Sequence, residues 1–148
     1  MNLFTGILLD NDIYMSQLVT FYNQYQARVL SCLPWVAAEL ADNSGFEAML
    51  AVIHKHGGRK LYISTNRDDF NKKLNTNLSD NEYQRIINNT DARGFIDLPS
   101  LWGIFLGVRR AGIIEALDAG HSNHEIISNF GITERGLRNY KKNDTTSK

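Results

Sequence analysis

Apolar residues recur at helical spacing along most of the chain, which predicts a mainly α-helical protein. From residue 13 to residue 33 they share one face that is rich in aromatic side chains, and Pro34 ends this helix before a short helical piece over 35–40. Further helices are predicted over 44–56, 65–74, 79–87 and 100–119. Residues 1–12 have no such pattern, and we expect them to be irregular.

Several of these helices carry their own start and stop signals. A serine followed three residues later by glutamate can form a capping box, in which each side chain bonds the backbone N–H of the other residue. Capping boxes are predicted for Ser44 with Glu47, Ser79 with Glu82, and Ser122 with Glu125. Gly57-Gly58 and Gly120 are predicted to end helices, because glycine readily takes the backbone conformation found after a helix.

One β-strand is predicted over 59–64, where polar and apolar residues alternate and β-branched and aromatic residues are frequent. No second convincing strand follows from the sequence. Because a lone strand leaves backbone N–H and C=O groups unpaired, it needs a partner. The simplest partner is the same strand of a second subunit, antiparallel about a two-fold axis. We therefore expect a homodimer in which Leu61, Tyr62 and Ile63 form the dimerisation strand.

Residues 122–142 predict two short helices joined by a tight turn. Their apolar stripes consist of Ile126, Ile127 and Phe130 in the first helix and Leu137 and Tyr140 in the second. Gly131 suits the positive φ that ends the first helix, and Thr133 is a natural N-cap for the second. These features are typical of a helix-turn-helix unit. Helix pairs with a glycine in the turn also occur in many other all-α proteins. The charge of the second helix is therefore needed to decide whether this pair is expected to bind DNA.

The polar face of this second helix is cationic. Its charged residues over 133–142 are Arg135, Arg138, Lys141 and Lys142, against Glu134 alone. The whole chain has 16 basic and 16 acidic residues, and residues 1–45 have only one basic residue against four acidic ones. This asymmetry indicates an association region and a separate basic DNA-binding region. The function we expect is sequence-specific binding of double-stranded DNA by a transcription regulator.

The candidate DNA-binding residues lie on the second helix and at the start of the first. Arg135, Arg138 and Asn139 are expected to contact base edges, because arginine can bind guanine and asparagine can bind adenine in bidentate fashion. Phosphate contacts are expected from Asn123, Thr133, Lys141 and Lys142. Glu134 lies on the same helix and belongs to the candidate set.

Two stretches of the chain together resemble the Mor transcription activator family of Mu-like phages. Residues 46–64 contain a helix ending in His54-Lys55-His56-Gly57-Gly58 and the strand Leu61-Tyr62-Ile63, and residues 122–142 contain the helix-turn-helix pattern. The resemblance implies an intertwined dimer whose two helix-turn-helix units bind a dyad-symmetric site near a promoter, in a phage or mobile element. Activation or repression, and contact with RNA polymerase, stay open.

The expected fold is mainly α with one short strand per subunit. We expect a helical and strand dimerisation region over 1–98 and a helix-turn-helix DNA-binding region over 99–148. The alternative function is that of a phage DNA-packaging or assembly protein that carries a helix-turn-helix. Such proteins tend to form rings, whereas a lone strand favours a closed two-fold dimer.

The sequence does not favour an enzyme. It has no glycine-rich phosphate loop and no nucleophile elbow. His54 and His56 are too close in sequence to share one helix face, so we expect no metal site and no cofactor. The single Cys32 excludes an intrachain disulfide. A cytoplasmic location is expected, because no apolar run is long enough to span a membrane and the N-terminus lacks the features of a signal peptide.

Overall fold

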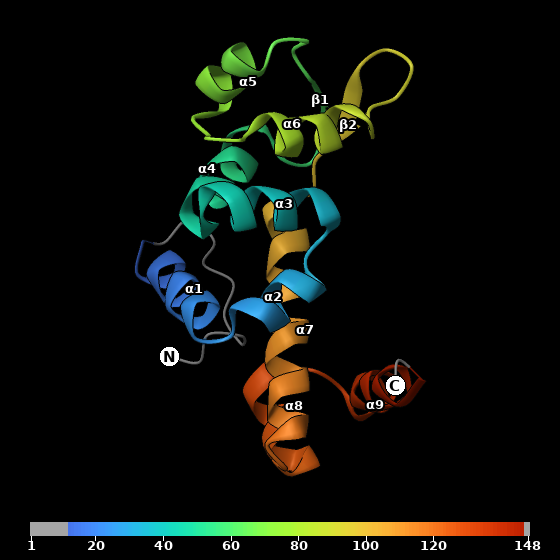
Figure 1. Cartoon of the computed structure of the whole chain (residues 1–148). Helices are drawn as coiled ribbons and strands as arrows, with labels where there is room; N and C mark the ends of the chain where they lie inside the picture. The colour runs from blue at the N-terminus through green and yellow to red at the C-terminus, as the bar shows by residue number, and fades with distance from the viewer. Residues whose placement is uncertain (1–11, 147–148) are drawn as a thin grey trace. The chain divides into compact units, whose positions relative to one another are not determined.

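The computed structural model describes the backbone of residues 12–146 and the side chains of residues 15–142. Within this range the protein is mainly helical, as predicted, with one small antiparallel sheet (Figure 1). In chain order the elements are α1 (Asp12–Gln24), α2 (Gln26–Cys32), α3 (Trp35–Ser44), α4 (Phe46–His56), β1 (Lys60–Tyr62), α5 (Arg67–Leu74), α6 (Asp80–Ile87), β2 (Phe95–Asp97), α7 (Leu101–Asp118), α8 (Asn123–Phe130) and α9 (Glu134–Thr146). The irregular segment predicted at the N-terminus lies outside the described residues, apart from Asp12.

The described residues form two compact units. One contains the residues up to Cys32 together with those from Leu106 onward, and the other contains residues 33–105. The N-terminal helices α1 and α2 therefore belong to the same unit as α8 and α9. The expected division at residue 98 had placed them with the middle of the chain.

In the first unit, apolar residues of α1, α2 and α7 supply buried side chains. These include Leu18, Tyr22, Val29, Val108 and Ile113. Arg28 of α2 forms ion pairs with Glu115 and Asp118 of α7, at 3.0 and 2.7 Å. The single helix predicted over 13–33 is divided at Tyr25 into α1 and α2. Because the helical spacing of apolar residues continues through this bend, the sequence pattern does not reveal it.

In the second unit, α3 and α4 pack against each other and carry much of the core. The buried side chains of this helix pair are Val36, Ala37, Leu40, Ala41, Phe46, Met49, Leu50, Val52 and Ile53. Asn66 caps α5 by accepting hydrogen bonds from the N–H groups of Asp68 and Asp69, close to the start of the helix predicted over 65–74. The rings of Phe70 in α5 and Tyr83 in α6 lie 5.6 Å apart, and the Tyr83 hydroxyl donates to the Ser64 carbonyl.

The prediction of a lone strand is wrong, because β1 pairs with β2 of the same chain. The register places Lys60 opposite Asp97, Leu61 opposite Ile96, and Tyr62 opposite Phe95. The sequence did not reveal β2 because the alternation of polar and apolar residues that surrounds β1 is absent there: Phe95 and Ile96 are adjacent apolar residues in a short segment between Gly94 and Pro99.

The expected dimerisation strand is therefore already paired within its own chain. Leu61 and Ile63 are buried, whereas Tyr62 is exposed. The unpaired strand was the physical reason for expecting a homodimer, and β2 removes that reason. The homodimer itself stays a prediction.

The capping box predicted at Ser44 is also wrong. Helix α3 extends to Ser44, and Gly45, with φ of 100°, precedes α4 without any side-chain cap. The Ser44 hydroxyl accepts a hydrogen bond from the N–H of Asn77 instead, at 3.2 Å. The other two predicted capping boxes, at Ser79 and Ser122, are confirmed.

Candidate nucleic-acid interface

The turn between α8 and α9 has the local geometry that the sequence predicts. Gly131 is in the left-handed conformation, with φ of 62° and ψ of 37°, and its N–H bonds the carbonyl of Ile127. The Thr133 hydroxyl accepts from the N–H of Gly136 at 3.0 Å, which caps the start of α9. Both helix ends at this turn are therefore defined by hydrogen bonds.

Apolar contacts bury the inner faces of the two helices. Ile126 and Phe130 of α8 and Leu137 of α9 are all buried, and Ile127 and Tyr140 are half-buried. Burial of a leucine or isoleucine side chain stabilises a fold by about 1.5–3 kcal/mol. The apolar stripes predicted from the sequence thus hold α9 against the rest of its unit by one face.

The opposite face of α9 is exposed and basic. Arg135, Arg138, Asn139 and Lys142 are all exposed. Their positions i, i+3, i+4 and i+7 lie on one side of a helix, about half a turn away from Leu137. The helix therefore presents three cations and one amide in a single exposed stripe, on the side opposite its buried apolar face.

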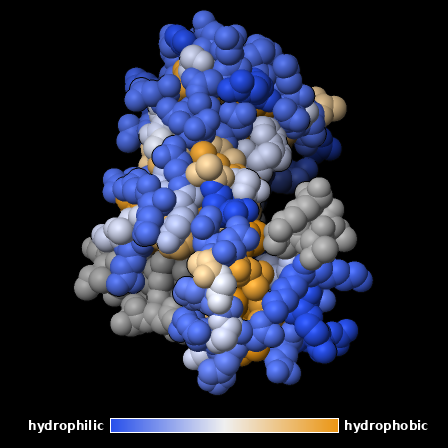
Figure 2. All heavy atoms as spheres, turned by 60° about the horizontal axis from the view of Figure 1, so that its bottom comes forward, coloured by the Kyte–Doolittle hydropathy of each residue, from blue (hydrophilic) through white to orange (hydrophobic). Residues whose placement is uncertain are grey.

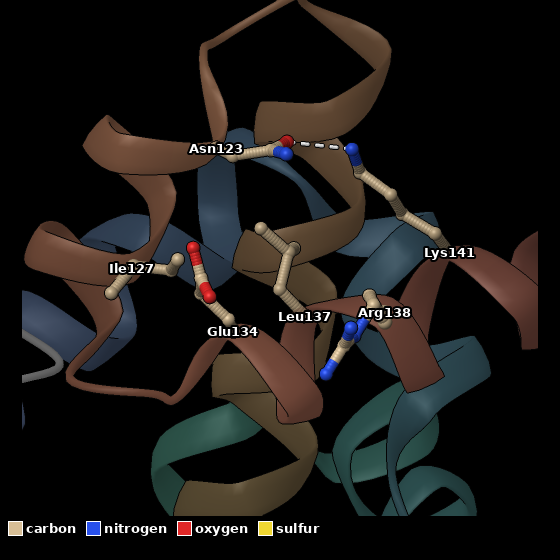
Figure 3. Close-up of a pocket in the computed structure, with 6 residues that line it drawn as sticks. All are labelled: Asn123, Ile127, Glu134, Leu137, Arg138 and Lys141. Atoms are coloured by element: carbon tan, nitrogen blue, oxygen red, sulfur yellow. Dashed lines mark hydrogen bonds between the residues drawn. The ribbon is translucent and has the colours of Figure 1, made fainter.

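A shallow hollow of about 160 Å³ lies between α8 and α9 (Figure 3). It is lined by Asn123, Ile127, Glu134, Leu137, Arg138 and Lys141. At one edge of it Lys141 donates a hydrogen bond from Nζ to Oδ1 of Asn123, at 2.6 Å. Two residues that the sequence assigned separately to phosphate contacts are therefore joined at the rim of the hollow. Because they are eighteen residues apart in the chain, the sequence pattern did not indicate this contact.

The first turn of α8 is held by Ser122 and Glu125. The Ser122 hydroxyl accepts from the N–H of Glu125 at 3.2 Å, and Oε1 of Glu125 accepts from the N–H of Ser122 at 3.4 Å. The pKa of Glu125 is lowered, first by the Ser122 hydroxyl, then by the Ser122 backbone N–H, and then by the nearby positive charges of His121 and His124. The ionised carboxylate is thus the form that stabilises this end of α8.

We expect the capping box to make the stability of α8 sensitive to acid. Because the pKa of Glu125 is lower in the folded chain than in the unfolded chain, its contribution is present above the unfolded pKa and is lost as the pH falls through the folded value. A Ser122→Ala variant should raise the pKa of Glu125 towards its ordinary value, as measured by NMR titration of the carboxyl carbon. Ser128→Ala, on an exposed position of the same helix, is the matched control and should leave that pKa unchanged. An unchanged Glu125 pKa in the Ser122 variant would contradict the capping role.

Other kinds of site are not seen in the described part of the chain. It contains no group of three or more His, Cys, Asp or Glu residues placed to hold a metal ion. Likewise, none of the helices described over 12–146 is long and apolar enough to cross a membrane.

The surface seen in Figure 2 is mostly hydrophilic, with smaller areas of hydrophobic residues. The large hydrophobic side chains that are most exposed among the described residues are Trp35, Tyr62 and Trp102. All three lie in the unit of residues 33–105. None of them is part of the basic stripe on α9.

Comparison with known proteins does not extend this description. No family model matches the chain, and it has no match among curated proteins or solved structures. The case for a function therefore depends on the geometry and chemistry of α8 and α9.

Proposed function

We propose that this protein is a sequence-specific regulator of transcription that binds double-stranded DNA, with α8 and α9 as a helix-turn-helix unit. The observation that carries the proposal is the stripe of Arg135, Arg138, Asn139 and Lys142 on the exposed face of α9. A B-DNA major groove is wide enough to admit one α-helix. In this proposal α9 enters the groove with its basic stripe towards the bases.

The side chains of the stripe suit direct contact with base edges. A guanidinium group can donate two hydrogen bonds to O6 and N7 of guanine, and a carboxamide can pair with N6 and N7 of adenine. Arg138 and Asn139 lie in the middle of the stripe and are the base-contacting residues, together with Arg135. Because the buried side of α9 fixes the helix in place, these side chains lose less freedom on binding than they would on a mobile segment.

The phosphate backbone would be held by Lys142, at one end of the stripe, and by groups beside the stripe. Lys141 donates to Asn123, and its positively charged side chain is exposed beside the stripe. The Asn123 amide nitrogen is also a donor, and it lies at the first residue of α8, where backbone N–H groups favour anions. Thr133 and Lys142 complete the phosphate-contacting set, and Glu134 lines the hollow beside them.

The resemblance to the Mor family extends the proposal to two copies of the chain on a dyad-symmetric site. The resemblance consists of the short strand β1, which follows Gly57-Gly58 after Arg59, and of the helix-turn-helix pattern over 122–142. Mass measurement in solution, with and without DNA, tests this part separately. A complex with one copy of the chain on a single half-site would contradict it.

We expect Arg138→Ala and Lys142→Ala to change DNA binding in different ways. Loss of a bidentate base contact should remove about 1–3 kcal/mol of discrimination at one base pair, whereas loss of a phosphate contact should weaken all sequences alike and reduce the salt dependence. The measurement is binding to a site obtained by selection from random duplexes, compared with a scrambled duplex, over a series of salt concentrations. Arg85→Ala is the control, because Arg85 pairs with Glu39 at 3.1 Å in the other unit. Equal losses on both duplexes for the Arg138 variant would refute base contact.

A further inference from the structure

A second group of basic residues lies at the C-terminal end of α4. The unit of residues 33–105 has eight basic and nine acidic residues, so its charges nearly balance. Several of its cations are paired with carboxylates: Lys60 with Asp91, Arg67 with Asp80, and Arg85 with Glu39, at 3.1–3.5 Å. Cations of the same unit that have no acidic partner among the described residues therefore differ from these paired groups.

Three such cations are Lys55, Arg59 and Lys73, which we call the α4 cluster. All three are exposed, and no carboxylate of the described residues forms an ion pair with them. Arg59 donates from Nη2 to the Lys55 carbonyl at 2.8 Å and from Nε to the His56 carbonyl at 3.4 Å. These bonds hold the guanidinium at the end of α4 and leave its charge unneutralised, because its partners are neutral carbonyls.

The side chain of His56 lies at the same end of α4 and is influenced by all three cations. Its Nε2 atom is buried and has no hydrogen-bond partner. The pKa of His56 is lowered, first by burial and then by the positive charges of Lys55, Lys73 and Arg59. No carboxylate contributes to this shift. Cations of α4, of α5 and of the segment before β1 therefore each act on the same imidazole, and the Arg59 guanidinium lies at the end of α4 itself.

We propose that the α4 cluster binds phosphates of the DNA backbone, as a second contact surface besides α9. This inference rests on the proposed function and adds a contact that carries no sequence information. An anion placed at the cluster would neutralise cations that have no carboxylate partner among the described residues, and lysine and arginine are the usual partners of phosphate oxygens. DNA is the anion that the proposed function brings to the protein. An acidic protein surface would bind the same charges but would leave the salt dependence of DNA binding untouched.

The test uses the full chain with the double substitution Lys55→Gln and Lys73→Gln. Each phosphate contact contributes about 0.9 to the slope of log K against log salt for B-DNA. The double variant should therefore show a slope smaller by about 2, and it should weaken the selected and the scrambled duplex by the same factor. Lys60→Gln is the matched control, because Lys60 already pairs with Asp91, and its slope should stay close to that of the wild type. Circular dichroism checks that each variant is folded.

A second measurement reports on the cluster itself. Phosphates bound at Lys55, Arg59 and Lys73 should raise the pKa of His56, because they stabilise the imidazolium. NMR titration of the His56 ring proton, assigned with His56→Gln, should show this rise when the scrambled duplex is added.

The combined outcomes separate the two proposals. A wild-type slope in the double variant together with an unmoved His56 pKa would overturn the α4 cluster, while loss of discrimination in Arg138→Ala would still support α9. A reduced slope and a raised His56 pKa, with full discrimination retained in Arg138→Ala, would support the cluster and overturn the role of α9. Absence of any DNA binding by the wild-type chain would overturn both.

Discussion

A Gly57→Ala variant is expected to lose about 3 kcal/mol of its free energy of unfolding. A Cβ atom at Gly57 would lie 2.6 Å from the carbonyl oxygen of Pro99 and would also overlap the carbonyl oxygen of Ile53. Both obstacles are backbone atoms, so they cannot turn aside as a side chain can, and overpacking of this kind costs about 1–3 kcal/mol or more. The backbone of Gly57 is extended, with φ of −68°, so the cost is steric. Urea unfolding of the variant measures it.

The control for this prediction is Gly103→Ala, which should act in the opposite direction. Gly103 lies inside α7, and a Cβ there would be 3.5 Å from Cβ of Pro99, which is an ordinary van der Waals contact. Replacing glycine by alanine within a helix should stabilise it by about 1 kcal/mol. If both variants changed stability by the same amount, the close approach of the chain at Gly57 would not be the cause.

The second large effect is expected from Leu137→Ala. Leu137 is buried on the inner face of α9, and truncation of a buried leucine costs about 2–5 kcal/mol. Because this face holds α9 in place, the variant should lose binding to the selected and the scrambled duplex together. Hydrogen exchange of the α9 amides, which should become faster, measures the local loss of structure, and fluorescence anisotropy measures binding.

Asn139→Ala is the matched control on the same helix. Asn139 is exposed, so the substitution should leave hydrogen exchange in α9 nearly unchanged and should reduce only the preference for one base pair. Wild-type DNA affinity in Leu137→Ala, at the same protein concentration, would mean that α9 does not need its packed face in order to bind. That result would contradict the proposed recognition helix.

The candidate interface could be predicted from the sequence because its determinants are local. The bonds between Ser122 and Glu125, the positive φ of Gly131 and the cap at Thr133 each involve residues within a few positions of one another. The basic stripe of α9 follows from helical periodicity alone once its buried face is identified. Such interactions depend only on residues that are close together in the chain, so the sequence pattern is enough to predict them.

The remaining features depend on residues that are distant in the chain. The pairing of β1 with β2, the bond of Ser44 to Asn77, and the contact of Lys141 with Asn123 join segments that no local pattern connects. The α4 cluster is of the same kind, since only the fold shows that Lys60 has a carboxylate partner while Lys55 and Lys73 do not. The sequence by itself determined most of the helices, the capping boxes at Ser79 and Ser122, and the basic face of α9. The tertiary structure alone decided which polar groups meet across the fold, because these contacts depend on how distant segments pack together.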